Sequence, residues 1–261
     1  MVVEIVKREL GNEAEVTETQ VTKANGVVKT GITIKFAGSN LAPTIYTDEI
    51  KGTDEEKAKE IIRIARENQI PNIDIESFTD YSKAKLNIRV KLLNRKANEN
   101  LSAVKFDTVF PDLIAVPYVE ILETGTITVQ SEHIKAWGVS EDEVYADALL
   151  NMMSETKIAS IGSVINEMTD GELTVPEDEA MLVLSNKKKT FGAANILVAN
   201  IPEGKIMLPS SIHEVILIDG EGADAEFLKA MVREINATQV SDTDKLSDNV
   251  YKYENGKWVI L

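Results

Sequence analysis

The chain has 261 residues, of which 43% are hydrophobic and 27% charged, a composition typical of a globular protein with a sizeable core. Its formal net charge of −15 disfavours direct binding to nucleic-acid phosphates, which generally requires clustered Lys and Arg. It contains no cysteine, which excludes disulfides, thiolate nucleophiles and sulfur-ligated zinc, and favours a cytoplasmic setting.

Neither targeting nor membrane segments are predicted. The first nine residues lack a long apolar stretch behind a basic start, so we expect no secretory signal peptide. No window of about 18 apolar residues occurs, so we expect no membrane span.

The first elements are a hairpin and a helix. Alternating polar and apolar residues predict strands at 16–23 and 27–36, joined by Asn25-Gly26, a pair typical of type I′ turns. Thr53 and Glu56 form a capping-box pattern, and apolar residues follow at helical spacing. We therefore predict an amphipathic helix from this box to about Asn68.

The middle of the chain mixes strands and short helices. Strands are predicted at 86–93, 112–121 and 126–129. Because Pro117 cannot donate a backbone hydrogen bond, we expect an edge position or a bulge there. Gly138 predicts the end of a short helix that begins near Ser131. A second capping-box pattern at 140–143 predicts a helix to about residue 153, and 156–169 predicts another helix.

The last ninety residues continue this mixture. The predicted elements are strands at 181–184, 205–208 and 215–218, helices at 191–200 and 224–236, and a hairpin at 250–260 around Asn255-Gly256. Helices and strands interleave without strict alternation, which indicates an α+β fold with mixed sheets, hairpins at both ends and several amphipathic helices. Turn residues and acids near residue 170 suggest two regions, 1–170 and 171–261; the alternative is one continuous domain.

The segment 206–218 places Ser210, Ser211, His213 and Glu214 between two apolar strands. One hypothesis is a hydrolase in which Ser210 or Ser211 is the nucleophile and His213 the base. In an extended segment, however, Glu214 points away from the face shared by Ser211 and His213, and the chain has no Gly-x-Ser-x-Gly elbow. Pro-Ser-Ser also suits a turn between strands, so we favour a structural interpretation and assign no catalytic residue.

No metal or cofactor site is predicted either. The two histidines, His133 and His213, are distant in sequence, and the acidic run 219–226 departs from the calcium-loop pattern. The basic run 187–189 is not part of any nucleotide-binding signature.

Several segments together identify a family resemblance. They are residues 25–28 with 43–46, DLIAV at 112–116, HIKAWGVS at 133–140, LPSSIHEVI at 208–216, MVREIN at 231–236 and LSDNVYKY at 246–253. On these motifs the chain resembles a family of uncharacterised bacterial proteins, a domain of unknown function, from about residue 15 to 254. The resemblance implies a bacterial or phage-borne intracellular setting and no reaction, cofactor or catalytic residue.

We therefore expect a non-enzymatic acidic protein that acts by binding another macromolecule, a protein partner and in particular a basic one. Glu55, Glu60, Glu141 and Asp142 on two acidic helices are the partner-binding candidates. A specific form of this hypothesis is a phage or mobile-element inhibitor that blocks a host nucleic-acid-binding system by imitating the charge of DNA. The alternatives are the hydrolase described above and a structural or assembly protein.

Overall fold

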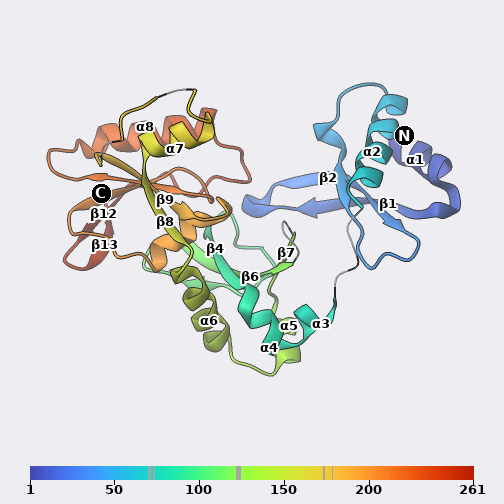
Figure 1. Cartoon of the computed structure of the whole chain (residues 1–261), viewed down its shortest axis with the longest axis horizontal. Helices are drawn as coiled ribbons and strands as arrows, with labels where there is room; N and C mark the ends of the chain where they lie inside the picture. Colours follow the sequence, from blue (N-terminus) through green and yellow to red (C-terminus); the bar gives the residue numbers. More distant parts are fainter. Residues whose placement is uncertain (70–71, 73, 122–124, 173, 178) are drawn as a thin grey trace. The chain divides into compact units, whose positions relative to one another are not determined.

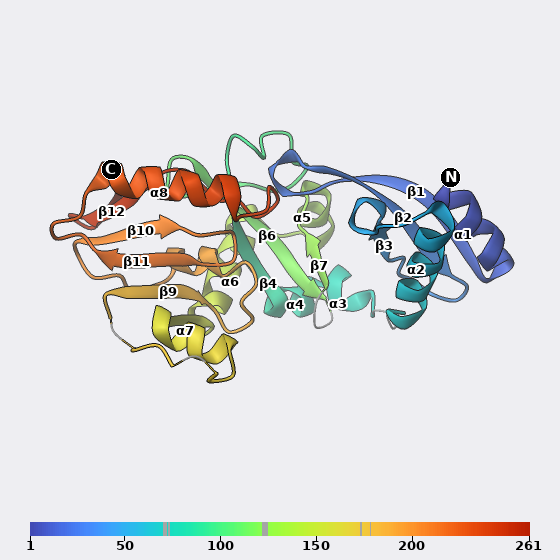
Figure 2. The same ribbon diagram turned by 90° about the horizontal axis from the view of Figure 1, so that it is seen from above.

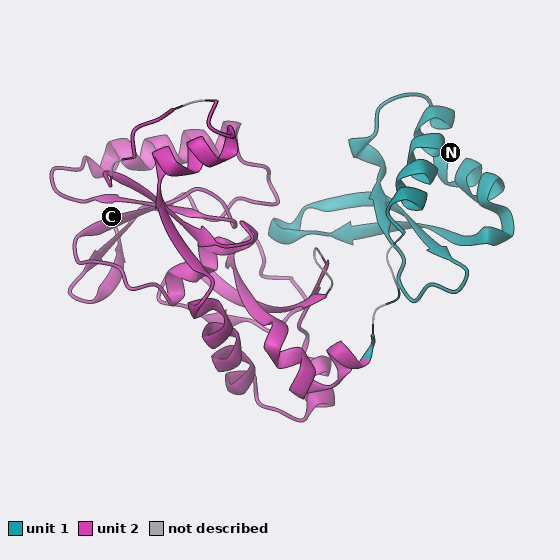
Figure 3. Cartoon of the chain, viewed as in Figure 1, with its two compact units in different colours: residues 1–75 teal, residues 76–261 magenta. Residues whose placement is uncertain are grey.

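The computed structural model describes residues 1–69, 72, 74–121, 125–172, 174–177 and 179–261. The chain divides into two compact units, unit 1 (Met1–Ile75) and unit 2 (Glu76–Leu261), coloured separately in Figure 3. The boundary expected near residue 170 stays a prediction. Strands β8 (Thr156–Ser160) and β9 (Met181–Asn186), which flank it, pair in one sheet and favour the alternative of a continuous domain there.

Unit 1 is an antiparallel sheet, β1-β2-β3, with two helices (Figure 1). Its elements are α1 (Val2–Leu10), η1 (Gly11–Glu13), β1 (Ala14–Thr22), η2 (Ala24–Gly26), β2 (Val28–Phe36), β3 (Thr44–Tyr46), η3 (Thr47–Glu49) and α2 (Asp54–Glu67). The predicted hairpin is confirmed. Asn25 and Gly26 have φ angles of 59° and 69°, the left-handed values that a type I′ turn requires at both positions.

Both helices of unit 1 bury an apolar stripe against the sheet. The core consists of Val3, Val6 and Leu10 from α1, Ala58, Ile61 and Ala65 from α2, and Val16, Ile32 and Ile34 from the strands. The capping box of α2 is confirmed, because Thr53 Oγ1 accepts a hydrogen bond from Glu56 N at 3.3 Å and Glu56 Oε2 accepts one from Thr53 N at 2.8 Å. The helix ends at the predicted Asn68 cap.

Unit 2 contains two sheets and several helices (Figures 1 and 2). Besides β8 and β9, its elements are α3 (Glu76–Thr79), α4 (Tyr81–Ala84), η4 (Lys85–Asn87), β4 (Ile88–Asn94), β5 (Phe106–Asp107), β6 (Leu113–Ile121), β7 (Gly125–Thr128), α5 (Ser131–Trp137), α6 (Glu141–Met153), α7 (Ile161–Met168), η5 (Gly192–Leu197), β10 (Lys205–Pro209), β11 (Val215–Asp219), α8 (Ala225–Thr238), β12 (Tyr251–Glu254) and β13 (Lys257–Ile260).

The larger sheet has the strand order β13-β12-β10-β11-β9-β8, and the smaller one places β6 between β4 on one side and β5 and β7 on the other. Helices α7 and α8 lie on the same face of the larger sheet (Figures 1 and 2). There Leu228 and Val232 of α8 pack on Ile206 and Leu208 of β10. The α+β class is confirmed. Mixed sheets were expected, whereas every strand pair in the described residues is antiparallel.

Two local predictions for unit 2 were wrong. Pro117 lies in the central strand β6 and not at an edge, and the pairing of β6 with β4 continues through it without a bulge. The Pro117 carbonyl accepts a hydrogen bond from Val129 N at 2.9 Å. Proline has no N–H group to donate to the Val129 carbonyl in return, and that carbonyl instead accepts a hydrogen bond from Val104 N at 3.0 Å. In the segment 156–169, the first five residues form β8, and the helix, α7, begins at Ile161.

Candidate functional site

The four acidic candidates lie on two helices in different units. Glu55 and Glu60 belong to α2 of unit 1, and Glu141 and Asp142 to the first turn of α6 in unit 2. Glu60 accepts a hydrogen bond from Arg63 Nε at 2.9 Å, which lowers the pKa of its carboxyl group and offsets its charge. Most of the negative charge belongs to unit 2, which has 30 Asp and Glu against 18 Lys and Arg, compared with 13 against 10 in unit 1.

The serine and histidine candidates form the turn between β10 and β11. The hydroxyl groups of Ser210 and Ser211 both donate to Glu214 Oε1, at 3.0 and 3.1 Å. His213 Nδ1 accepts a hydrogen bond from Phe191 N at 3.2 Å. In the described contacts, therefore, no serine hydroxyl is hydrogen-bonded to the imidazole, as a nucleophile and its base would be.

The backbone around His213 has a packing role. The His213 carbonyl accepts a hydrogen bond from Ser185 Oγ at 2.8 Å. The imidazole ring of His213 stacks on the ring of Phe191, with centroids 5.7 Å apart. Gly192, the first residue of η5, lies against the same groups. A Cβ atom there would come within 2.7 Å of the His213 carbonyl and 2.3 Å of Ser185 Oγ. The segment 206–218 thus anchors η5 to the larger sheet, which supports the structural interpretation.

A polar cluster surrounds Asp112, which directly precedes β6. Its carboxylate accepts hydrogen bonds from Tyr251 OH at 2.6 and 2.8 Å, from Ser247 Oγ at 2.6 Å and from Asn249 Nδ2 at 2.9 Å. Asn236 of α8 donates to the Ser247 carbonyl at 2.9 Å. The cluster therefore brings together three of the segments that carry the family resemblance, 112–116, 231–236 and 246–253.

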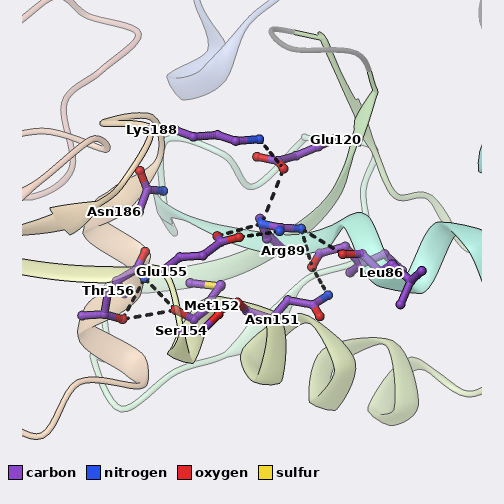
Figure 4. A network of polar contacts seen from close by, with 12 residues as sticks. Leu86, Arg89, Glu120, Asn151, Met152, Ser154, Glu155, Thr156, Asn186 and Lys188 are labelled. Atoms are coloured by element: carbon purple, nitrogen blue, oxygen red, sulfur yellow. Dashed lines mark hydrogen bonds and ion pairs between the residues drawn. The ribbon is translucent and has the colours of Figure 1, made fainter.

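A second polar network joins β4, β6 and the turns after α6 and β9 (Figure 4). Arg89, only 8% exposed, donates to both oxygens of Glu155 at 2.9 and 2.5 Å. Glu120 Oε2 lies 3.5 Å from Arg89 Nε and accepts a hydrogen bond from Lys188 Nζ at 2.7 Å. Two carboxylates thus face two cations, an arrangement in which the charges balance and the strands are held together.

Unit 2 also contains a cleft of about 640 Å³, within the range of ligand and side-chain binding sites. Its walls come from the end of β5, from α6, from η5 with the residues after it, and from the β12–β13 hairpin. The lining residues are Asp107, Thr108, Val109, Tyr145, Leu149, Ile196, Leu197, Ala199, Asn200, Ile201, Tyr253, Gly256, Lys257 and Trp258.

Aromatic residues are concentrated in this cleft. Tyr145, Tyr253 and Trp258 line it, although aromatic residues make up 5% of the chain. Tyr253 and Trp258 contact each other with centroids 5.1 Å apart, and Phe106 stacks on Tyr145 at 4.4 Å. These contacts hold the rings in place and leave them available as apolar anchors.

Helix α6 connects the cleft with the predicted acidic residues. Tyr145 and Leu149, one turn apart, line the cleft. Glu141 lies one turn before Tyr145, and Asp142 three residues before it, so both lie at the N-terminal end of the same helix face. The sequence indicated these two acids but not the cleft, because its walls come from segments up to 150 residues apart and no local pattern shows that they meet.

No group of three or more His, Cys, Asp or Glu side chains is placed to hold a metal ion in the part of the chain that the structure describes. Within the same residues, no helix has both the length and the apolar character needed to cross a bilayer.

The fold and the cleft define an α+β protein of two compact units with an aromatic-lined cleft in the second. A family model matches residues 1–255, and the chain belongs to this family, the family of unknown function DUF5688. The resemblance inferred from the motifs is thereby confirmed, and the match extends slightly beyond the expected range of 15–254 at both ends. Neither the curated proteins nor the solved structures include a match to the chain.

Proposed function

We propose that the protein acts by binding a basic protein partner through the cleft of unit 2. Apolar side chains of the partner enter between Tyr145, Tyr253 and Trp258, and its Lys or Arg residues face the first turn of α6. The observation that carries this proposal is the position of Glu141 and Asp142 on the helix face that also presents Tyr145 and Leu149 to the cleft.

The chemistry of the cleft supports a protein partner. Tyr and Trp are the residues that most often contribute binding energy at protein interfaces, because they bury a large area at low entropic cost. The excess of acidic residues in unit 2 raises the association rate of a positively charged partner. The cysteine-free sequence favours a cytoplasmic setting for this binding.

The other hypotheses have less support. The hydroxyl groups of Ser210 and Ser211 are directed to Glu214 and not to the imidazole of His213, which leaves the hydrolase without an activated nucleophile. The inhibitor that imitates DNA and the assembly protein remain predictions, the former a specific case of the binding proposed here.

The test selects peptides from a random display library against the full chain at low salt. We expect the enriched peptides to combine an apolar anchor with flanking Lys or Arg. Their affinity should fall about tenfold or more with Val109→Lys, which puts a positive charge in the cleft at an exposed position, and with the double variant Glu141→Lys/Asp142→Lys. The matched control is Glu221→Lys/Glu234→Lys, at two exposed acids of unit 2 outside the cleft lining, which should leave affinity unchanged.

Intrinsic fluorescence locates the bound peptide. The chain has two tryptophans, and Trp137 lies in α5 against Phe78 and Tyr81, away from the cleft lining. In a Trp137→Phe background, Trp258 alone reports, and bound peptide should change its emission. Equal affinity of the cleft variants and the control, or emission that stays constant at saturation, would overturn the proposal.

A further inference from the structure

Strand β13 forms one edge of the larger sheet. It pairs with β12, joined by the two-residue turn Asn255-Gly256, and no other described strand pairs with it. Edge strands present unpaired backbone groups to which another chain can add.

The register shows which groups these are. Leu261 N donates to the Val250 carbonyl at 3.0 Å, and the antiparallel pairs Lys252–Val259 and Glu254–Lys257 follow at every second position. In an antiparallel pair, the residues between hydrogen-bonded positions direct their N–H and C=O groups away from the partner strand. The backbone groups of Trp258 and Ile260 therefore point outward, and in the described part of the chain neither makes a backbone hydrogen bond.

This open edge adjoins the cleft. Gly256, Lys257 and Trp258 are both part of the hairpin and part of the cleft lining. The side chains of Trp258 and Ile260 share one face of the strand, and Ile260 is 42% exposed. A strand added beside β13, about 4.8 Å away, would direct every second side chain to the face on which the cleft opens.

We propose that the partner binds as an extended basic segment that adds a strand to β13. Its alternate apolar side chains enter the cleft and its basic side chains face the acidic turn of α6. This inference rests on the function proposed above and specifies the conformation of the bound segment. A second copy of this chain is the less favoured occupant, because it would bring a unit with 30 acidic and 18 basic residues against an identical one.

The test applies backbone N-methylation, one residue at a time, to a peptide selected against the full chain. N-methylation blocks a backbone donor and adds bulk at that point. Affinity should fall about tenfold or more at every second residue of the central segment and stay within about twofold at the residues between, because successive N–H groups of a strand alternate in direction.

A protein variant tests the same contact from the other side. Ile260→Pro removes an outward N–H group without breaking the pairing with β12, whereas Ile260→Ala keeps that group and removes most of the side chain. We expect the proline variant to bind the peptide about fivefold more weakly than the alanine variant.

A uniform N-methylation profile, with equal affinities of the two Ile260 variants, would overturn strand addition. In that case, continued sensitivity to Val109→Lys would leave the proposed binding in the cleft intact. Sedimentation of the isolated protein as a dimer that Ile260→Pro dissociates would also overturn the inference, since a second copy would then occupy the edge.

Discussion

The hydroxyl group of Tyr251 donates a bifurcated hydrogen bond to the two carboxylate oxygens of Asp112, which lie at 2.6 and 2.8 Å. The two residues are 139 positions apart. Asp112 follows the segment 107–109, which forms one wall of the cleft, and Tyr251 begins the hairpin that forms another. This contact therefore fixes the distance between two walls of the proposed binding site.

Tyr251→Phe should lower the free energy of unfolding by about 1.5–3 kcal/mol, because it removes hydrogen bonds to a charged group from a fully buried ring. Urea denaturation measures this loss. The matched control is Tyr253→Phe, whose hydroxyl group makes no hydrogen bond in the described contacts and which should cost less than about 0.5 kcal/mol. Equal losses in both variants would contradict this role of Asp112.

The tyrosines should titrate abnormally at high pH. Burial raises the pKa of Tyr81, Tyr118 and Tyr251 above the usual value of 10.0, and for Tyr81 and Tyr251 hydrogen bonds to Asp147 and Asp112 raise it further. The folded state then holds these protons more tightly than the unfolded state. Their contribution to stability is complete below about pH 10 and is lost as the pH rises above it.

Ultraviolet absorbance measures this titration directly. In the folded protein, part of the phenolate signal should be missing at about pH 11 and appear when denaturant is added. Complete ionisation of all tyrosines near pH 10 without unfolding would show that these rings are accessible to solvent.

The capping box of α2 should contribute measurably to stability. Thr53→Ala should lower the free energy of unfolding by about 1 kcal/mol, because it leaves the Glu56 amide without its acceptor.

The carboxylate in the same capping box should make the stability of α2 depend on pH. The hydrogen bond from the Thr53 amide lowers the pKa of Glu56 below 4.5, so the contribution of the carboxylate is present above about pH 4.5 and lost as the pH falls through the lowered value. Hydrogen exchange should show that the first turn of α2 opens faster at low pH in the wild type. In Glu56→Gln, which has no carboxyl group to titrate at this position, the rate of opening should change little with pH.

Ser210 and Ser211 should not react with a fluorophosphonate probe. Both hydroxyl groups donate to Glu214, so His213 cannot accept a proton from either without a rearrangement of the turn. Mass spectrometry of the treated protein should find both serines unmodified. Labelling of either serine that disappears in His213→Ala would instead establish the hydrolase.

Local patterns predicted local structure well. The turn at Asn25-Gly26, the cap at Thr53 and the helix end at Gly138 depend on neighbouring residues, and all three are confirmed. Helix α1 was missed although Val3, Val6 and Leu10 have helical spacing, because the additional apolar residues around them obscure the periodicity.

Long-range contacts were beyond this kind of prediction. Nothing near Pro117 indicates that Val104, in a distant loop, supplies the donor that proline lacks. The same holds for the candidate site. Glu141 and Asp142 were identified by charge, but Tyr253 and Trp258 become part of a cleft only because Asp112 and Tyr251 hold remote segments together.

The Arg89 network allows a last prediction about what stabilises unit 2. Arg89→Met should cost about 3–5 kcal/mol, because it leaves the largely buried carboxylates of Glu155 and Glu120 without their shared cation. Lys188→Met removes a cation that is half exposed and should cost about 1 kcal/mol or less. Adding Glu155→Leu to Arg89→Met should recover part of the loss, since an apolar pair replaces a buried ion pair and Glu120 keeps Lys188. The alternative outcome is a double variant whose loss in free energy of unfolding equals the sum of the losses for Arg89→Met and Glu155→Leu. The two side chains would then not interact, and packing of the arginine stem would account for the effect of Arg89→Met.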